Sequence, residues 1–327
     1  MLLCDVWSEP APDAGLILRR NALRGTTHDD QTNQSWIGDN MALPKIKAFT
    51  GSPLADAEQP FYSALYAGTL EPATTTEFVV STDYGYRVVF HGSFTVVGGE
   101  VTGGTVTGYD AFAGSTQTLK ASGYSFEAAA FFEAVQNYNL DSEPFYDIVE
   151  AQPIKFIGSD YGDRFGGTDG ADVLVGKRGG DDLFGADGDD VIKGDKGQDS
   201  LVGGDGFDTL TGGSGNDVFV FFLDLTEPPP TTFDKITDFK HGRDHIGLSV
   251  YDGIDDLLPP GELDGKYFHK GTEATTADQH VIYDKKTGKI YFDADGSGDE
   301  AQFLMAKVKA QTKLSADDFY SGGAMVA

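Results

Sequence analysis

The fold is decided by residues 158–220, which divide into seven consecutive nonapeptides: GSDYGDRFG, GTDGADVLV, GKRGGDDLF, GADGDDVIK, GDKGQDSLV, GGDGFDTLT and GGSGNDVFV. No residue is inserted or lost between one unit and the next. Position one of every unit is Gly, position six is Asp and position eight is apolar. A solvated linker rich in Asp and Gly would not keep an apolar residue at one fixed position, so the pattern indicates a folded repeat structure.

The repeated positions define three sets of residues. The aspartates at position six are Asp163, Asp172, Asp181, Asp190, Asp199, Asp208 and Asp217. The apolar residues at position eight are Phe165, Leu174, Leu183, Ile192, Leu201, Leu210 and Phe219. After the first unit, glycines stand at position one (Gly167, Gly176, Gly185, Gly194, Gly203, Gly212) and at position four (Gly170, Gly179, Gly188, Gly197, Gly206, Gly215).

A period of nine fits neither a helix nor a simple alternating strand, so each unit is predicted to be a glycine turn followed by a short strand. Stacked units bury one column of apolar side chains that no single unit could bury. If two units make one full turn, each aspartate lies above the one eighteen positions later, and the two like charges repel. A divalent cation between them would remove that repulsion.

The chemistry of the repeats favours calcium. Residues 158–220 hold 14 Asp, no Glu and 5 Lys or Arg, which gives a net charge of −9. Carboxylates and backbone carbonyls form a hard oxygen site that suits Ca²⁺, whereas Mg²⁺ demands octahedral geometry and keeps several waters. We therefore expect the repeat block to need the metal in order to stay folded.

The nonapeptides resemble the consensus GGxGxDxUx of the RTX (hemolysin-type) family. This resemblance implies a right-handed parallel β-roll that binds calcium. It also implies that up to five ions lie between the aspartate pairs, with backbone oxygens of the glycine loops completing each site. The pairs are Asp163/Asp181, Asp172/Asp190, Asp181/Asp199, Asp190/Asp208 and Asp199/Asp217. Tyr161, Arg178 and Lys196 depart from the consensus in the first, third and fifth loops.

Residues 221–327 extend the resemblance. The segments 233–239, 242–249 and 283–298 resemble the C-terminal part of the serralysin β-roll domain. In that family the end of the chain is an uncleaved signal for a type I (ABC) exporter, and residues 314–320 occupy the corresponding place. The resemblance implies a secreted, extracellular protein. The runs 281–283 and 289–292 around the turn 284–288 predict a hairpin.

Residues 41–157 are predicted to form a β-rich N-terminal module with one helix. Strand-like sequence runs from Phe61 to Tyr124, broken by glycines at 85, 92, 98–99 and 103–104. Ser125 is a suitable N-cap for a helix that reaches about Tyr138. Residues 1–40 contain the single cysteine, Cys4, and carry no Sec-type signal sequence. They are interpreted either as a disordered tail or as an over-extended start.

Composition restricts the partners. A formal charge of −28 argues against nucleic acid and favours cations, and no apolar stretch approaches the ~20 residues of a membrane helix. The sequence contains no HExxH, GxSxG or GxxxxGK[ST] motif. We therefore expect a secreted calcium-binding protein without enzymatic activity.

Two alternatives depend on residues 60–155: a polysaccharide lyase or epimerase, and a glycan-binding adhesin. An enzyme would need clustered acidic and basic groups there, and the cationic candidates are His91, Arg87, Lys120 and Lys155. Either alternative would make an extracellular polysaccharide the partner. An adhesin could stack sugar rings on the tyrosines of this region, although sheet packing also explains them: Tyr62, Tyr66, Tyr84, Tyr86, Tyr109, Tyr124 and Tyr138.

Two weaker metal motifs follow the repeats. Residues 293–298 (DADGSG) resemble the start of an EF-hand loop, but position twelve is Leu304 instead of Glu, so a structural hairpin is favoured over an auxiliary calcium site. His241 and His245 are four apart, as on a helical metal site, but Gly242 between them disfavours a helix.

Overall fold

The computed structural model describes residues 45–48, 59–140, 142–149, 151–223, 230–250 and 257–322. Residues 1–40, interpreted as a tail or an over-extended start, lie outside these ranges. Within them the chain is mainly β, with two long sheets and a few short helices, which confirms the predicted fold class. No helix in the described part of the chain has the length and apolar character needed to cross a membrane.

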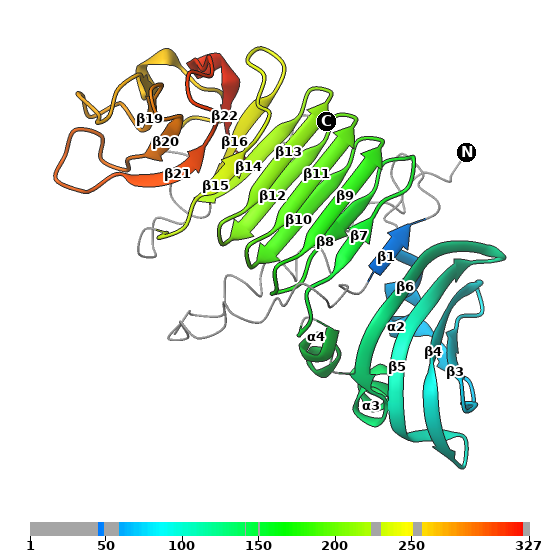
Figure 1. Cartoon of the computed structure of the whole chain (residues 1–327). Coiled ribbons are helices and arrows are strands. Elements are labelled where there is room, and N and C mark those ends of the chain that lie inside the picture. Colours follow the sequence, from blue (N-terminus) through cyan, green and yellow to red (C-terminus); the bar gives the residue numbers. More distant parts are fainter. Residues whose placement is uncertain are drawn as a thin grey trace, which may run out of the picture. The chain divides into compact units, whose positions relative to one another are not determined.

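The repeats form a parallel β-roll in which the chain alternates between two sheets (Figure 1). The first sheet contains β7 (Lys155–Ile157), β9 (Val173–Arg178), β11 (Val191–Lys196), β13 (Thr209–Ser214) and β15 (Asp234–Ile236). The second contains β8 (Arg164–Gly166), β10 (Asp182–Asp187), β12 (Ser200–Asp205), β14 (Val218–Leu223) and β16 (His245–Val250). Leu183 pairs with Leu201 and Ile192 with Leu210, so one turn is two repeats, as predicted.

The position-eight side chains form the core of the roll. Leu174, Ile192, Leu201 and Leu210 have no exposed surface, and none of the seven exceeds 4% exposure. The eighteen-residue register extends back to β7, where Phe156 pairs with Leu174. The Phe156 ring stacks on Phe165 with centroids 3.9 Å apart, so an aromatic pair closes this end of the apolar column.

The C-terminal residues continue both sheets. They form β17 (Gly261–Glu262), η1 (Gly265–Tyr267), β18 (Phe268–His269), β19 (Val281–Asp284), β20 (Lys289–Phe292), β21 (Phe303–Lys307), η2 (Ala316–Asp318) and β22 (Phe319–Ser321). Strand β21 pairs in parallel with β15, and β22 pairs in parallel with β16. The antiparallel pairing of β19 with β20 confirms the predicted hairpin.

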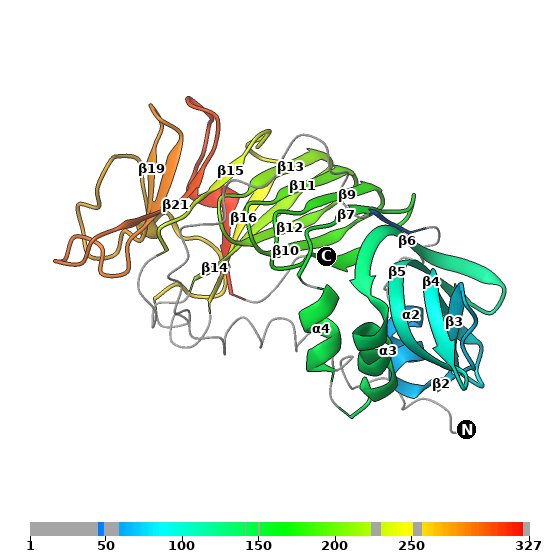
Figure 2. The same cartoon turned by 60° about the horizontal axis from the view of Figure 1, so that its bottom comes forward.

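The N-terminal module is an antiparallel meander with helices against one face (Figure 2). Its elements are β1 (Lys45–Ala48), α2 (Gln59–Ala67), β2 (Thr69–Leu70), β3 (Glu77–Ser81), β4 (Tyr86–Val97), β5 (Glu100–Ala113), β6 (Thr116–Glu127), α3 (Ala128–Asn137) and α4 (Glu143–Val149). Stacked and edge-on contacts of Phe78 with Phe90 and Phe132 hold the sheet and α3 together. Strand β1 pairs with β6 and with β7.

Several local predictions for this module need correction. Residues 61–67 are helical instead of extended. The module contains two helices, α2 and α4, in addition to the one helix that was expected. Gly92 and Gly103–Gly104 do not end strands but lie inside β4 and β5, where the register shifts at His91/Gly92 and Thr95/Val96. The expected helix is α3, but its N-cap is Glu127, whose carboxylate accepts from Ala129 N (3.1 Å) and Ala130 N (2.7 Å). Strand pairing extends β6 past Ser125, so the helix starts later.

Truncation of the apolar column tests this packing. Leu201→Ala should lower the free energy of unfolding by about 2–5 kcal/mol, because the cavity lies between two sheets that cannot close on it. The measurement is a urea unfolding midpoint in saturating calcium. Lys193→Ala, on the exposed face of β11, is the matched control and should leave the midpoint nearly unchanged. Equal midpoints for the two variants would contradict the packing described.

Candidate metal centre

The seven position-six aspartates lie at the turns that lead into the strands, and each is at most 3% exposed. They form two columns, one on each side of the roll. Asp163, Asp181, Asp199 and Asp217 precede strands of the second sheet, and Asp172, Asp190 and Asp208 precede strands of the first. Neighbours within a column are eighteen residues apart, as the repeat predicted.

In each predicted pair, one carboxylate oxygen of the aspartate later in the chain accepts a hydrogen bond from the backbone of the earlier one. Oδ1 of Asp181 accepts a hydrogen bond from the backbone N–H of Asp163 at 2.8 Å. The same contact joins Asp172 to Asp190 (2.7 Å), Asp181 to Asp199 (3.0 Å), Asp190 to Asp208 (2.8 Å) and Asp199 to Asp217 (3.2 Å). The structure therefore brings together all five pairs, through backbone to side-chain hydrogen bonds.

The second carboxylate oxygen behaves differently along the ladder. Oδ2 is buried and has no hydrogen-bond partner in Asp181, Asp190, Asp199, Asp208 and Asp217. In Asp163 and Asp172 the same atom accepts from the N–H of Ser159 (2.6 Å) and Thr168 (2.5 Å). A buried anionic oxygen without a partner is strongly unfavourable, so each of the five needs a proton or a cation.

The predicted glycines surround these oxygens. A Cβ on any of the six position-one glycines would lie 2.0–2.4 Å from Oδ2 of the aspartate in its own unit; for Gly176 and Asp181 the distance is 2.0 Å. The position-four glycines stack on one another. Gly197 has φ +154°, and a Cβ there would lie 1.4 Å from Gly179 O. Glycine is required at position one for space beside the carboxylate, and at position four for contact between turns.

Burial raises the pKa of the ladder carboxyls. The pKa rises to about 8 for Asp181, about 9 for Asp190 and about 7 for Asp199, chiefly through desolvation. The charge of neighbouring aspartates raises the pKa further but is the smaller cause. Repulsion between stacked aspartates, the reason inferred from the sequence, is therefore secondary to the loss of water.

Two further aspartates belong to the ladder and were missed. Oδ1 of Asp234 accepts from Asp208 N (3.3 Å), and Oδ1 of Asp244 accepts from Asp217 N (3.4 Å). Both are buried, and burial together with the Asp208 charge raises the pKa of Asp234 to about 9. Spacings of 26 and 27 residues hide them from a search at period eighteen. The signal was Asp-x-Ile at 234–236 and 244–246, which repeats positions six to eight.

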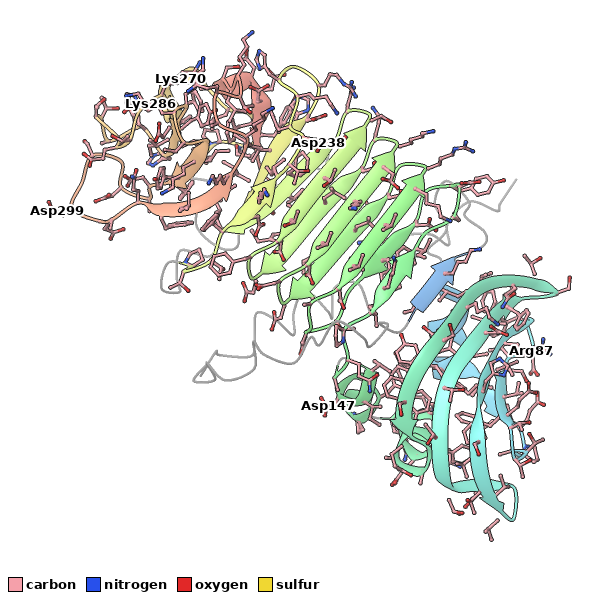
Figure 3. All side chains as sticks on the ribbon, viewed as in Figure 1. Arg87, Asp147, Asp238, Lys270, Lys286 and Asp299 are labelled. Carbon is pink, nitrogen blue, oxygen red and sulfur yellow. The ribbon has the colours of Figure 1, made fainter. Side chains whose placement is uncertain are left out.

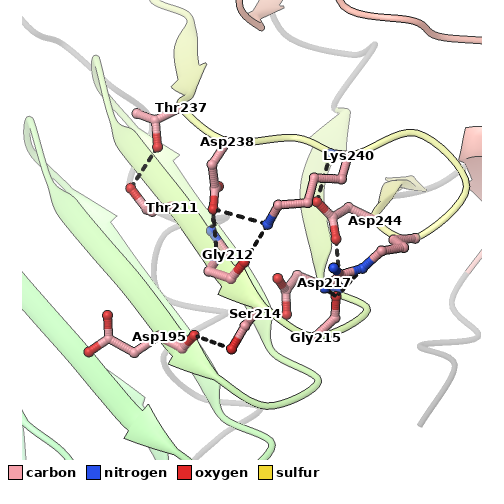
Figure 4. Close-up of polar contacts among 12 residues, drawn as sticks. Asp195, Thr211, Gly212, Ser214, Gly215, Asp217, Thr237, Asp238, Lys240 and Asp244 are labelled. Carbon is pink, nitrogen blue, oxygen red and sulfur yellow. Dashed lines mark hydrogen bonds and ion pairs between the residues drawn. The ribbon is translucent and has the colours of Figure 1, made fainter.

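The seventh unit is held by side chains of the segment after β15, among them Asp238 (Figure 3) and Lys240 (Figure 4). Asp238, which follows β15, accepts from Gly212 N (3.0 Å) and Gly213 N (2.9 Å). Lys240 Nζ donates to Gly213 O, and the guanidinium of Arg243 donates to Gly215 O. Ammonium and guanidinium groups thus hold the carbonyls at positions two and four of the seventh unit.

The residues that depart from the repeat consensus lie outside the ladder interior. The Arg178 side chain is 61% exposed and lies 3.9 Å from an Asp160 carboxylate oxygen, and Lys196 is exposed. Asp181 and Asp199, in the same units, keep unpartnered Oδ2 atoms. Among the described residues no three His, Cys, Asp or Glu side chains converge in metal-binding geometry. A metal in the ladder therefore needs backbone carbonyls as well as carboxylates.

The other sequence candidates are placed as follows. His241 Nδ1 lies 2.8 Å from both carboxylate oxygens of Asp318, whereas the His245 ring in β16 contacts Tyr320. The two histidines therefore have different partners and do not form a site. Among the tyrosines of the N-terminal module, Tyr124 and Tyr138 are buried, while Tyr66 and Tyr84 are more than 60% exposed.

A charged cluster lies across the N-terminal sheet. His91 Nδ1 is 3.2 Å from a Glu77 carboxylate oxygen, and His91 Nε2 is 3.1 Å from Asp110 Oδ2. Lys120 Nζ lies 3.1 Å from Asp110 Oδ1. Strands β3 to β6 thus bring His91 and Lys120, two of the cationic candidates, to one acidic pair.

The chain was compared with protein families, curated proteins and solved structures. Residues 111–319 match the family described as peptidase M10 serralysin C terminal. No curated protein matches the chain. Similar solved structures include two subunits of a mannuronan C5-epimerase from Azotobacter vinelandii. AlgE6R2 is 23% identical, with a TM-score of 0.31, and the match covers 48% of this chain and 89% of that one. AlgE6R3 is 27% identical, with a TM-score of 0.24 and coverage of 50% and 80%.

A third similar structure is the extracellular lipase LipA from Serratia marcescens. It is 12% identical, with a TM-score of 0.19, and the match covers 51% of this chain and 40% of the lipase. Because these TM-scores are low, the assignment rests on the family match, which spans more than half of the chain, and on the RTX repeats inside it. The chain belongs to the serralysin C-terminal family.

Proposed function

We propose that this protein is a secreted calcium-binding protein whose β-roll folds when it meets extracellular calcium. The observation that carries the proposal is the set of five buried carboxylate oxygens without partners, on Asp181, Asp190, Asp199, Asp208 and Asp217. Each is fixed by the hydrogen bond of its sister oxygen, so it cannot turn away to solvent. Only a bound proton or a bound cation removes the cost of burying it.

The donor set fits calcium. The ladder offers carboxylate and backbone carbonyl oxygens, which are ligands of hard cations. The aspartate pairs would hold up to five ions, with the carbonyls of the position-one and position-four glycine turns as further ligands. Calcium bound there supplies the positive charge that burial of the carboxylates requires, and its binding free energy becomes folding free energy.

The family and the energetics together support secretion. Free calcium in the cytosol lies far below the 10⁻⁴ to 10⁻³ M affinities typical of extracellular modules, so the roll would stay unfolded during passage through a type I exporter. Outside the cell, calcium would drive folding. The C-terminal strands β21 and β22 would then act as the cap, because each extends one sheet of the roll and solenoids need capped ends.

Protons and calcium should compete for the same oxygens. In the calcium-free fold the carboxyls of Asp181, Asp190 and Asp199 have pKa values of about 7 to 9, against an ordinary value of 3.8. A raised pKa in the folded state means that folding takes up protons. The stabilisation is complete below the ordinary pKa and is lost as the pH rises through 7 to 9.

Replacing two ladder aspartates tests the calcium sites. Asp190→Asn with Asp199→Asn should weaken four of the five proposed sites, because each aspartate belongs to two pairs. Far-UV circular dichroism should show wild type gaining β structure as calcium replaces EDTA, and the double variant should need at least about tenfold more calcium. Asp195→Asn with Asp205→Asn removes the same charge from exposed positions and should match wild type. Equal calcium midpoints for all three proteins would refute the ladder as the binding site.

The pH dependence of the calcium-free protein gives a second test. In EDTA, far-UV circular dichroism should show more β structure at pH 5 than at pH 8, because the buried carboxyls are protonated in the fold at pH 5. Calcium should restore the β structure at pH 8, since the metal takes the place of the protons. Equal β structure in EDTA at both pH values, or less at pH 5, would show that the buried carboxyls do not control folding.

Truncation tests export. Removing about the last 50 residues should retain the protein in a host that carries its exporter, because the family signal lies at the C-terminal end. Deletion of residues 1–40 is the matched control and should leave secretion unchanged. The amount of protein in the medium is the measurement. Normal secretion of the C-terminally truncated chain would place the export signal elsewhere.

A further inference from the structure

The loop between β20 and β21 contains a second group of buried oxygens, outside the ladder. Phe292 pairs with Phe303 at the base of this hairpin, and residues 293–302 between them read DADGSGDEAQ. The loop carries four acidic residues and no Lys or Arg. Asp293 follows Phe292 and Gln302 precedes Phe303, so the backbone places both side chains at the mouth of the loop.

Three side-chain oxygens in this loop are buried and have no hydrogen-bond partner: Asp293 Oδ1, Asp295 Oδ1 and Gln302 Oε1. Asp293 is only 5% exposed. In two of these side chains, the second polar atom of the same group forms a hydrogen bond. Gln302 Nε2 donates to Thr272 O at 2.7 Å, and Asp295 Oδ2 accepts from Glu300 N at 3.1 Å. The unpartnered oxygens are therefore fixed in place.

The Asp293 carboxylate is directed into the loop. The groups that act on it most strongly are the Asp295 carboxyl and the backbone N–H groups of Asp295 and Gly296. Two acidic groups thus meet in a buried place where nothing positive balances them among the described residues of the loop.

The segment 272–280 fixes the loop from outside. Asp293 N donates to His280 O at 2.9 Å, and Ser297 N donates to Thr276 O at 3.2 Å. Gly296 has φ +64°, and a Cβ there would lie 2.6 Å from the carbonyl oxygens of Thr276 and Ala277. Only glycine permits this close approach of the loop to two backbone carbonyls.

We propose that this loop is a calcium site separate from the ladder, with Asp293, Asp295 and Gln302 as side-chain ligands. Two carboxylates and one amide oxygen are hard ligands that suit Ca²⁺, and no nitrogen or sulfur ligand takes part. The loop starts like an EF-hand but closes differently: Gln302, at position ten, provides the oxygen that Leu304 at position twelve cannot. This chemistry goes beyond the stacked-aspartate function proposed above and does not depend on it.

Occupancy of this site would stabilise the cap of the roll. The loop joins β20 to β21, and β21 is the strand that pairs with β15 at the end of the first sheet. An ion that neutralises Asp293 and Asp295 would hold the hairpin closed. The cap would then acquire its final form under the same condition that folds the ladder, namely extracellular calcium.

Calcium counting on the full-length chain tests the proposal. After equilibrium dialysis in millimolar calcium, bound metal is measured by mass spectrometry of the elements. Asp295→Asn should bind about one ion fewer per chain than wild type. Asp299→Asn, at the exposed tip of the same loop, is the matched control and should bind the same number (Figure 3). A wild-type ion count in Asp295→Asn would overturn the site.

A second variant covers the case in which Asp295→Asn fails to fold. Gln302→Glu adds a charge to the same oxygen set and should bind one of the ions at least about threefold more tightly in a calcium titration. Unchanged affinities would also overturn the proposal. Asp190→Asn with Asp199→Asn separates this site from the ladder. That variant should lose ladder ions but keep the ion that Asp295→Asn removes.

Discussion

The structure depends on one unfavourable contact, a carboxylate oxygen buried without a partner. In Asp181, Asp190, Asp199, Asp208 and Asp217, one carboxylate oxygen accepts a hydrogen bond from the backbone of a neighbouring turn, and the other is unpartnered beside a glycine. The first oxygen fixes the spacing of the turns through its hydrogen bond. The second needs a proton or a cation before the turns can stay folded together. Because both belong to one side chain, register and metal dependence cannot be separated by small changes elsewhere in the roll.

Much of the roll could be predicted because its pattern is local and regular. The nine-residue period predicts one strand in each unit between Phe165 and Phe219. Two units per turn then predict which strands and which aspartates are neighbours. Asp234 and Asp244 were missed because extra residues precede each of them and interrupt the eighteen-residue spacing. Their strands, β15 and β16, nevertheless pair with β13 and β14 as the next turn of the roll would. Repulsion between stacked aspartates, inferred from the sequence as the reason for a cation, is only the smaller cause, because the sequence shows which charges are neighbours but not how completely water is excluded.

The N-terminal module was harder to predict because some of its glycines lie at turns and others lie inside strands. Gly85 and Gly98–Gly99 lie at turns, as expected. Gly92 and Gly104 instead lie inside paired strands, where a Cβ would overlap Thr105 O or Ser93 O across the sheet. A sequence does not distinguish a glycine that ends a strand from one that lets two strands approach. The EF-hand-like loop shows the same limit, since Gln302 became a candidate ligand only once the hairpin register was known.

The alternation of the chain between two sheets restricts how the roll can change its length. One extra nonapeptide would move every later strand to the opposite sheet, so that β21 and β22 would each meet the wrong neighbour. An extra pair would leave the cap unchanged and add one complete turn with two more aspartates. The cationic closure by Lys240 and Arg243 would also keep its place on the last unit. Rolls with this cap are therefore expected to differ in length by multiples of eighteen residues. Each added turn brings acidic charge together with the calcium sites that neutralise it.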